Sequence, residues 1–181
     1  MTDKTGVKPA MIETLIFLLF AILMITAGIG DFLTMKIPNW LNGLIGISFF
    51  GAAFVAGMSL EQIGWHVATS ALVLAFGFGL FAAGYLGGGD AKLLAVTALW
   101  LGSGQLIEFL IVMALAGGVL AGVMKLWWWV RLELELRGLE QVKSGVKTSI
   151  DLPYGIAIAV GGLFAFWHSW WLETANLPLL G

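Results

Sequence analysis

The chain contains no cysteine and little charge, and both shortages restrict the chemistry open to it. Without cysteine there is no disulfide, no thiolate nucleophile and no cysteine-ligated zinc. The two histidines, His66 and His168, are too few for a convincing metal centre, so we expect no metal and no cofactor. Charged residues make up 11% of the 181 residues and the formal net charge is −2, which argues against a nucleic-acid partner.

Apolar residues, by contrast, are abundant. Hydrophobic residues make up 60% of the chain, and its mean hydropathy is +0.97. A soluble domain of this size could not bury so much apolar surface, so the lipid bilayer is the expected solvent. The composition therefore predicts an all-α integral membrane protein, with a single membrane domain over residues 1–181.

Six apolar segments are candidate spans, since a helix needs about 20 mainly apolar residues to cross a bilayer. They cover about residues 11–30, 41–57, 67–85, 91–102, 106–130 and 153–172. We therefore expect a six-helix transmembrane bundle. The fourth segment is short for a span, and a re-entrant segment is the alternative there.

The longest hydrophilic stretch covers residues 131–151. Leucine and valine recur in it at helical spacing, which favours an amphipathic helix at the cytoplasmic surface, broken near Gly138 or Gly145. A solvated connecting loop is the alternative for this stretch.

Lysine and arginine indicate how the spans are oriented. If the segment after the first span is cytoplasmic, seven of these residues lie inside, and only Lys4 and Lys8 lie outside. Both termini then face outward, and Asp31 and Asp90 reach the cytoplasmic side at the ends of the first and third spans. The tryptophans fall near predicted span ends and are interpreted as interface anchors, with Trp100 among those on the outer side.

An ionisable side chain at membrane depth is costly, so it is a functional hypothesis by default. Near a helix end simpler interpretations are open. Asp90 could cap the helix over residues 91–102, with the glycines before it forming only a tight turn. Asp31 alone could be an ordinary turn residue at the interface.

The two aspartates together favour catalysis, because the expected topology puts them on one side at similar depth. Two nearby carboxylates cannot both ionise easily, so one tends to hold a proton while the other is an anion. Such a pair can activate water and hydrogen-bond a scissile carbonyl, as in aspartic proteases. Gly87, Gly88 and Gly89 would let backbone approach a peptide closely and would allow unusual φ angles.

Three motifs resemble those of the type IV prepilin peptidases, a family of integral-membrane aspartyl proteases. Residues 87–90 read GGGD, a GxGD motif, and are followed by AKLLA. Asp31 stands six residues before the IPN at residues 37–39, and the LPYG at residues 152–155 opens the last span. The resemblance extends roughly from residue 31 to residue 162.

The resemblance implies a protease that removes basic leader peptides from prepilins and pilin-like proteins at the cytoplasmic face of the bacterial inner membrane. By motif match, Asp31 and Asp90 would be the catalytic pair. Larger bacterial members carry a cysteine-bearing insert and also methylate the new N-terminus. This chain lacks insert and cysteines, so it resembles the short members that serve Tad/Flp-type pili; archaeal preflagellin peptidases are close relatives.

The same motifs supply candidate supporting residues. They are Gly87, Gly88, Gly89, Lys92, Pro38, Pro153, Tyr154 and Gly155. Lys92 does not share a helix face with Asp90, so it is interpreted as a headgroup anchor in preference to an ion-pair partner. Tyr154 could reach the interface or donate its hydroxyl near the site.

Two other functions remain open from the sequence. A small transporter or channel subunit could use Asp31 and Asp90 as a proton relay, although a relay needs polar groups through the bilayer depth and the middles of the spans are almost bare. A structural membrane subunit could use the two aspartates only as helix caps.

Overall fold

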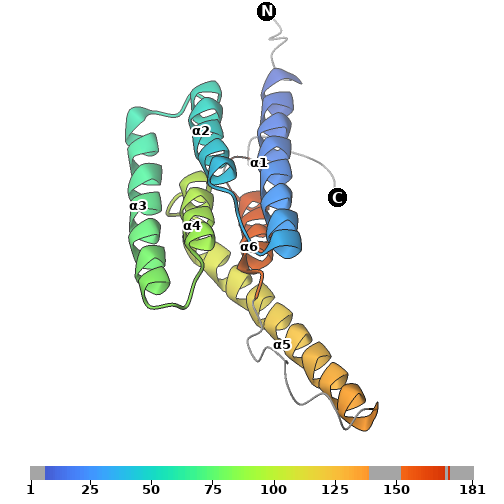
Figure 1. Ribbon diagram of the computed structural model, residues 1–181. Coiled ribbons are helices and arrows are strands. Elements are labelled where there is room, and N and C mark those ends of the chain that lie inside the picture. The colour runs from blue at the N-terminus through green and yellow to red at the C-terminus, as the bar shows by residue number, and fades with distance from the viewer. Residues whose placement is uncertain (1–6, 139–151, 170, 172–181) are drawn as a thin grey trace, which may run out of the picture.

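A computed structural model of the protein describes residues 7–138, 152–169 and 171, and this part of the chain is helical without a strand (Figure 1). The helices are α1 (Val7–Thr34), α2 (Asn39–Val55), α3 (Leu60–Ala82), α4 (Gly88–Leu101), α5 (Leu106–Gly138) and α6 (Tyr154–Trp167). The prediction of an all-α membrane protein built from six helices is confirmed.

Three of the helices are long and apolar enough to cross a membrane. These spans are Met11–Thr34, Leu60–Ala82 and Leu106–Arg131. The other helices, α2, α4 and α6, have 17, 14 and 14 residues and are shorter than the about 20 residues that a span needs. The short helices lie among the long ones, and their first turns lie at the same end of the bundle as the last turn of α1.

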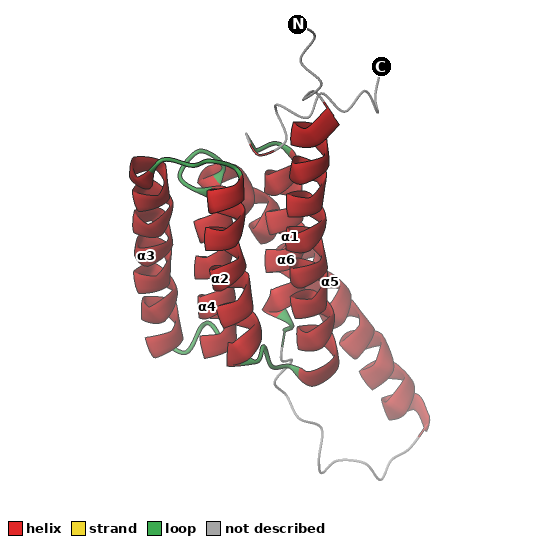
Figure 2. Cartoon of the chain, turned by 90° about the horizontal axis from the view of Figure 1, so that it is seen from above, coloured by secondary structure: helices red, strands yellow, loops and turns green. Residues whose placement is uncertain are grey.

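Helix α4 lies at the centre of the packing. It contacts α2, α3 and α6, while α6 also packs against α1 and α5. Figures 1 and 2 show the helices roughly side by side, with the later part of α5 leaving the bundle. Residues 131–138 therefore continue α5 without a break instead of starting a separate surface helix. The remainder of the predicted amphipathic segment lies outside the described residues.

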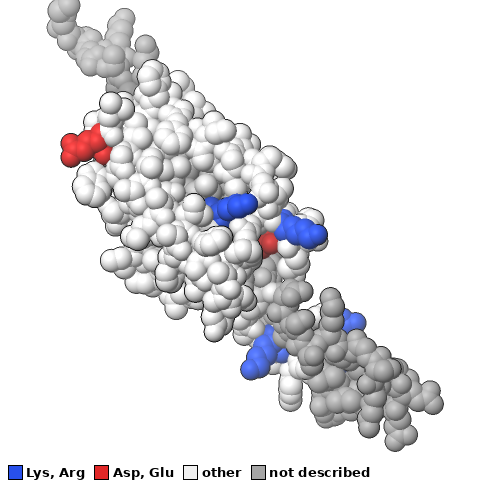
Figure 3. Space-filling model, turned by 60° about the vertical axis from the view of Figure 1, so that its left-hand side comes forward, with Lys and Arg blue, Asp and Glu red and all other residues white. Residues whose placement is uncertain are grey.

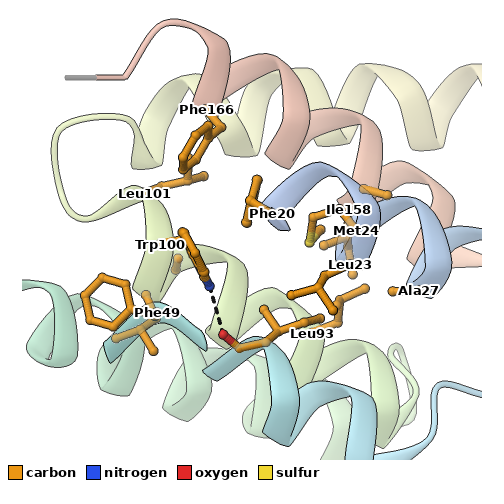
Figure 4. Close-up of a cluster of buried hydrophobic side chains, with 14 of the residues drawn as sticks. Phe20, Leu23, Met24, Ala27, Phe49, Leu93, Trp100, Leu101, Ile158 and Phe166 are labelled. Carbon is orange, nitrogen blue, oxygen red and sulfur yellow. Dashed lines mark hydrogen bonds between the residues drawn. The ribbon is translucent and has the colours of Figure 1, made fainter. Parts of the chain in front are cut away.

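An aromatic cluster fills the core between α1, α2, α4 and α6 (Figure 4). The rings of Phe20 and Phe166 stack with centroids 4.5 Å apart. Trp100 is fully buried, and its indole Nε1 donates a hydrogen bond to the carbonyl oxygen of Ile45 at 2.9 Å. The interpretation of Trp100 as an interface anchor is wrong, because its polar atom finds a backbone partner inside the bundle.

The outside of the bundle is apolar. Ile22, Leu72 and Val119, from three different helices, each expose more than 60% of their surface. On the face that Figure 3 shows, the described surface is almost entirely uncharged, and the charged side chains lie in a few places. Such a continuous apolar surface is stable against lipid and not against water.

Glycines let α6 pack closely on its neighbours. A Cβ added at Gly161 would lie 2.9 Å from the backbone nitrogen of Met113 on α5. One added at Gly162 would lie 2.8 Å from Cγ2 of Thr97 on α4. Real Cβ atoms do not approach backbone this closely, so the position of α6 depends on the absence of side chains here.

We predict that Gly161→Ala lowers the free energy of unfolding by about 1–3 kcal/mol, the usual cost of overpacking a well-filled core. The added methyl group meets the α5 backbone, which cannot rotate away as a side chain can. Denaturant unfolding in detergent micelles, followed by circular dichroism, measures the change.

The matched control is Gly118→Ala on α5, where a Cβ would meet nothing within 4 Å. If both substitutions destabilise the protein equally, close packing of α6 is not the reason.

Candidate active site

Asp31 and Asp90 line the same pocket, which lies at one end of the bundle. Asp31 is in the last turn of α1, and Asp90 is the third residue of α4. The pocket has a volume of about 530 Å³. Its other lining residues are the three glycines 87–89 and the segment 34–39 that joins α1 to α2.

Asp31 is buried, with 4% of its surface exposed, and it is tied to α6. Its Oδ2 accepts a hydrogen bond from the backbone N–H of Gly155 at 2.7 Å. That N–H belongs to the first turn of α6, where backbone donors have no partner within the helix. The positive end of the helix dipole also favours a carboxylate there.

Only glycine fits at position 155. A Cβ added there would lie 2.8 Å from both Cβ and Oδ2 of Asp31. The glycine of the LPYG motif is therefore required on steric grounds, because α6 begins in direct contact with the Asp31 carboxylate. Pro153 precedes this turn as the N-cap residue and does not line the pocket.

The Asp90 side chain lies against the turn that precedes α4. Its Oδ2 lies against Gly87, where an added Cβ would be 2.6 Å away, and the two aspartates interact electrostatically with each other. Among the described residues, Oδ1 of Asp90 is buried and has no hydrogen-bond partner. One carboxylate oxygen is therefore left for a ligand.

Two interpretations of the GGGD turn need correction. Helix α4 begins at Gly88 with Gly87 as its N-cap residue, so Asp90 lies inside the first turn and is not the cap. Gly87 has φ −69°, and the two glycines that follow are helical, so none of them needs an unusual φ. The glycine with positive φ in this connection is Gly84, at +78°.

What these glycines provide is space. A Cβ at Gly87 would lie 2.6 Å from Oδ2 of Asp90, and one at Gly89 would lie 3.2 Å from the carbonyl oxygen of Ile37. The first glycine makes room for the carboxylate itself. The other lets the segment between α1 and α2 lie directly on the start of α4.

Two further side chains hold the start of α2 against the start of α4. Lys92 Nζ donates a hydrogen bond to Oδ1 of Asn39 at 2.7 Å. Asn42 Nδ2 donates to the carbonyl oxygen of Gly89 at 3.3 Å. The sequence analysis did not name either amide as a site residue, although each stands in the first turn of α2, directly after the N-cap residue Pro38, where a polar side chain can reach a neighbouring helix end.

The remaining candidates take other places. Lys92 is exposed and lines a groove beside the pocket, bonded to Asn39 and not to Asp90. Tyr154 lines a separate apolar cavity between α3, α4, α5 and α6, so its ring does not border the two carboxylates. Within the described part of the chain, no group of three or more His, Cys, Asp or Glu side chains could hold a metal ion.

Fold and pocket together describe a helical integral membrane protein with two interacting carboxylates at one end of its bundle. Residues 18–122, more than half of the chain, match the model of the type IV leader peptidase family, and the chain belongs to that family. It is thus a membrane protease of the leader peptidase kind. The matched residues include Asp31 and Asp90. No curated protein and no solved structure matches the chain.

We predict that Gly155→Ala lowers the rate of leader cleavage about 100-fold, the cost of misplacing a reacting group by about 1 Å. The methyl group would displace the Asp31 carboxylate, from which its carbon would be 2.8 Å away. The measurement is single-turnover cleavage of a leader-bearing substrate by purified protein in detergent.

Gly30→Ala serves as the control, because a Cβ beside Asp31 on the same helix would meet nothing within 4 Å. Cleavage by Gly155→Ala at the wild-type rate would show that the contact between α6 and Asp31 is dispensable.

Proposed function

We propose that the protein is an aspartyl endopeptidase that removes the basic leader peptide from type IV prepilins or pilin-like proteins at the cytoplasmic face of the bacterial inner membrane. The observation that carries the proposal is the pocket shared by two interacting carboxylates from α1 and α4. Membership of the leader peptidase family favours this function over a proton relay.

The chemistry requires one proton shared between the two carboxylates. The ionised carboxylate takes a proton from a water molecule, whose oxygen attacks the carbonyl carbon of the scissile peptide bond. The protonated carboxyl gives its proton to the carbonyl oxygen, so a neutral tetrahedral intermediate forms. When that intermediate collapses, the C–N bond breaks and the leaving nitrogen takes up the proton that the first carboxylate took from water. A hydroxyl of the intermediate gives its proton to the other carboxylate as the carbonyl re-forms, so the pair again holds one proton.

The charge distribution supports a cytoplasmic orientation for the pocket. Lys36 lines the pocket and Lys92 borders it. Glu61 and Glu108 stand in the first turns of α3 and α5, at the opposite end of the bundle. Positive side chains collect on the cytoplasmic side of membrane proteins, so the pocket end is proposed to face inward.

We predict that Asp31→Asn and Asp90→Asn each lower the cleavage rate about 100- to 10,000-fold, the usual contribution of a general acid or base. Asparagine keeps the size of the side chain but can neither take nor give the required proton. Co-expression with a prepilin from the same genome, followed by gel analysis of leader removal, measures the loss.

Glu108→Gln is the matched control, since this carboxylate lies at the far end of the bundle. Membrane levels of all variants are compared by immunoblot. If either aspartate variant still cleaves at the wild-type rate, the proposed pair is wrong.

We also predict a bell-shaped dependence of kcat/KM on pH. The rate falls at low pH, where both carboxylates are protonated, and at high pH, where both are ionised. Initial rates measured with a peptide substrate over a range of pH values test this. A rate that rises through a single titration and then stays constant would contradict a shared proton.

A further inference from the structure

An open groove runs between α2 and α3. Both helices pack against α4 but make few contacts with each other, and Figures 1 and 2 show them standing apart. The groove has a volume of about 410 Å³ and is lined by all three helices. On α2 its lining residues recur every three or four positions, from Asn39 to Phe50, so they form one stripe of that helix.

The groove is mostly apolar, and the hydroxyl of Ser70, a polar lining residue away from the pocket, donates a hydrogen bond to the carbonyl oxygen of Ala95. Gly43 and Gly46 leave the α2 side without bulk, and beyond them Ile47 exposes 72% of its surface.

At the other end of the groove, Asn39 lines both the groove and the pocket that contains Asp31 and Asp90. The two hollows therefore meet at Asn39, and the groove extends from there along the lipid-facing side of α2.

One polar atom in the groove lacks a partner. Asn42 lines the groove and exposes only 4% of its surface. Its Nδ2 donates to Gly89, while its Oδ1 has no hydrogen-bond partner among the described residues. A buried acceptor without a donor is costly, and a ligand that brings an N–H group would remove that cost.

A peptide bond can be cleaved only where the substrate backbone is extended, so a helical substrate must unwind next to that bond. Unwinding exposes backbone N–H groups, which need acceptors in apolar surroundings. Asn42 lines the groove and is bonded to Gly89 of the pocket, so its Oδ1 can serve such an N–H group close to the scissile bond.

We propose that the groove between α2 and α3 binds the part of the substrate that follows the scissile bond, an apolar segment that matches the mostly apolar lining, with Asn42 Oδ1 accepting a backbone N–H from the first, unwound turn of that segment. This inference rests on the proposed function. There are two other apolar hollows, one between α1 and α6 and one between α3, α4, α5 and α6. Neither shares a lining residue with the pocket that contains Asp31 and Asp90.

The test is Gly43→Leu, which puts a bulky side chain into the groove from a position where a Cβ would meet nothing within 4 Å. We expect KM for a full-length substrate to rise about tenfold, while kcat stays within about twofold. A short peptide that spans the cleavage site but lacks the apolar segment should be cleaved as by wild type. Gly51→Leu is the control, an equally open glycine of α2 outside the groove.

The outcomes separate the two proposals. If wild type cleaves no leader-bearing substrate, the proposed function fails. If wild type cleaves and Gly43→Leu keeps the wild-type KM for the full-length substrate, the groove assignment is overturned.

If Gly43→Leu does not accumulate in the membrane, cysteine cross-linking tests whether the substrate occupies the groove. The method is specific here because the chain has no cysteine of its own. Ile47→Cys in the groove is compared with Ile29→Cys in the hollow between α1 and α6, both in the Asp90→Asn background. The substrate carries one cysteine in its apolar segment. A disulfide to position 47 supports the proposal, and a disulfide only to position 29 overturns it.

Discussion

The hydrogen bond from the Gly155 N–H to Asp31 Oδ2, at 2.7 Å, is the interaction on which the site depends. A buried carboxylate in a membrane protein has little water to solvate it, so the protein must supply the donors. The free N–H groups at the start of α6 do so. Because the contact leaves no room for a Cβ, it also fixes how closely α1 and α6 approach each other.

A second constraint places Asp90 opposite Asp31. The start of α4 is held by the segment before α2, whose Ile37 backbone lies against Gly89, and by the amides of Asn39 and Asn42. Four helix ends therefore meet at one pocket. Helix ends carry unsatisfied donors and acceptors, so they can form a polar site in a bundle whose helix sides are apolar.

The sequence predicted the helices well, because apolar runs of membrane length are a strong signal. It also placed Asp31 and Asp90 on one side, since alternating spans bring the ends of the first and third helices together. It did not predict that Trp100 is buried, because an outer-end tryptophan and a core tryptophan look alike in sequence. The role of Asn42 depends on contacts between residues 47 positions apart, which a helical pattern does not reveal.

The central claim is that a glycine amide at the start of α6 holds the Asp31 carboxylate in the unmutated protein, and solid-state NMR in lipid bilayers tests it directly. Aspartate carboxyl carbons are labelled with carbon-13 and glycine amides with nitrogen-15, and the signals are assigned with Asp31→Asn and Asp90→Asn. The account predicts strong dipolar dephasing of the Asp31 carboxyl carbon by the Gly155 amide nitrogen. An Asp31 signal that no glycine amide dephases would contradict it.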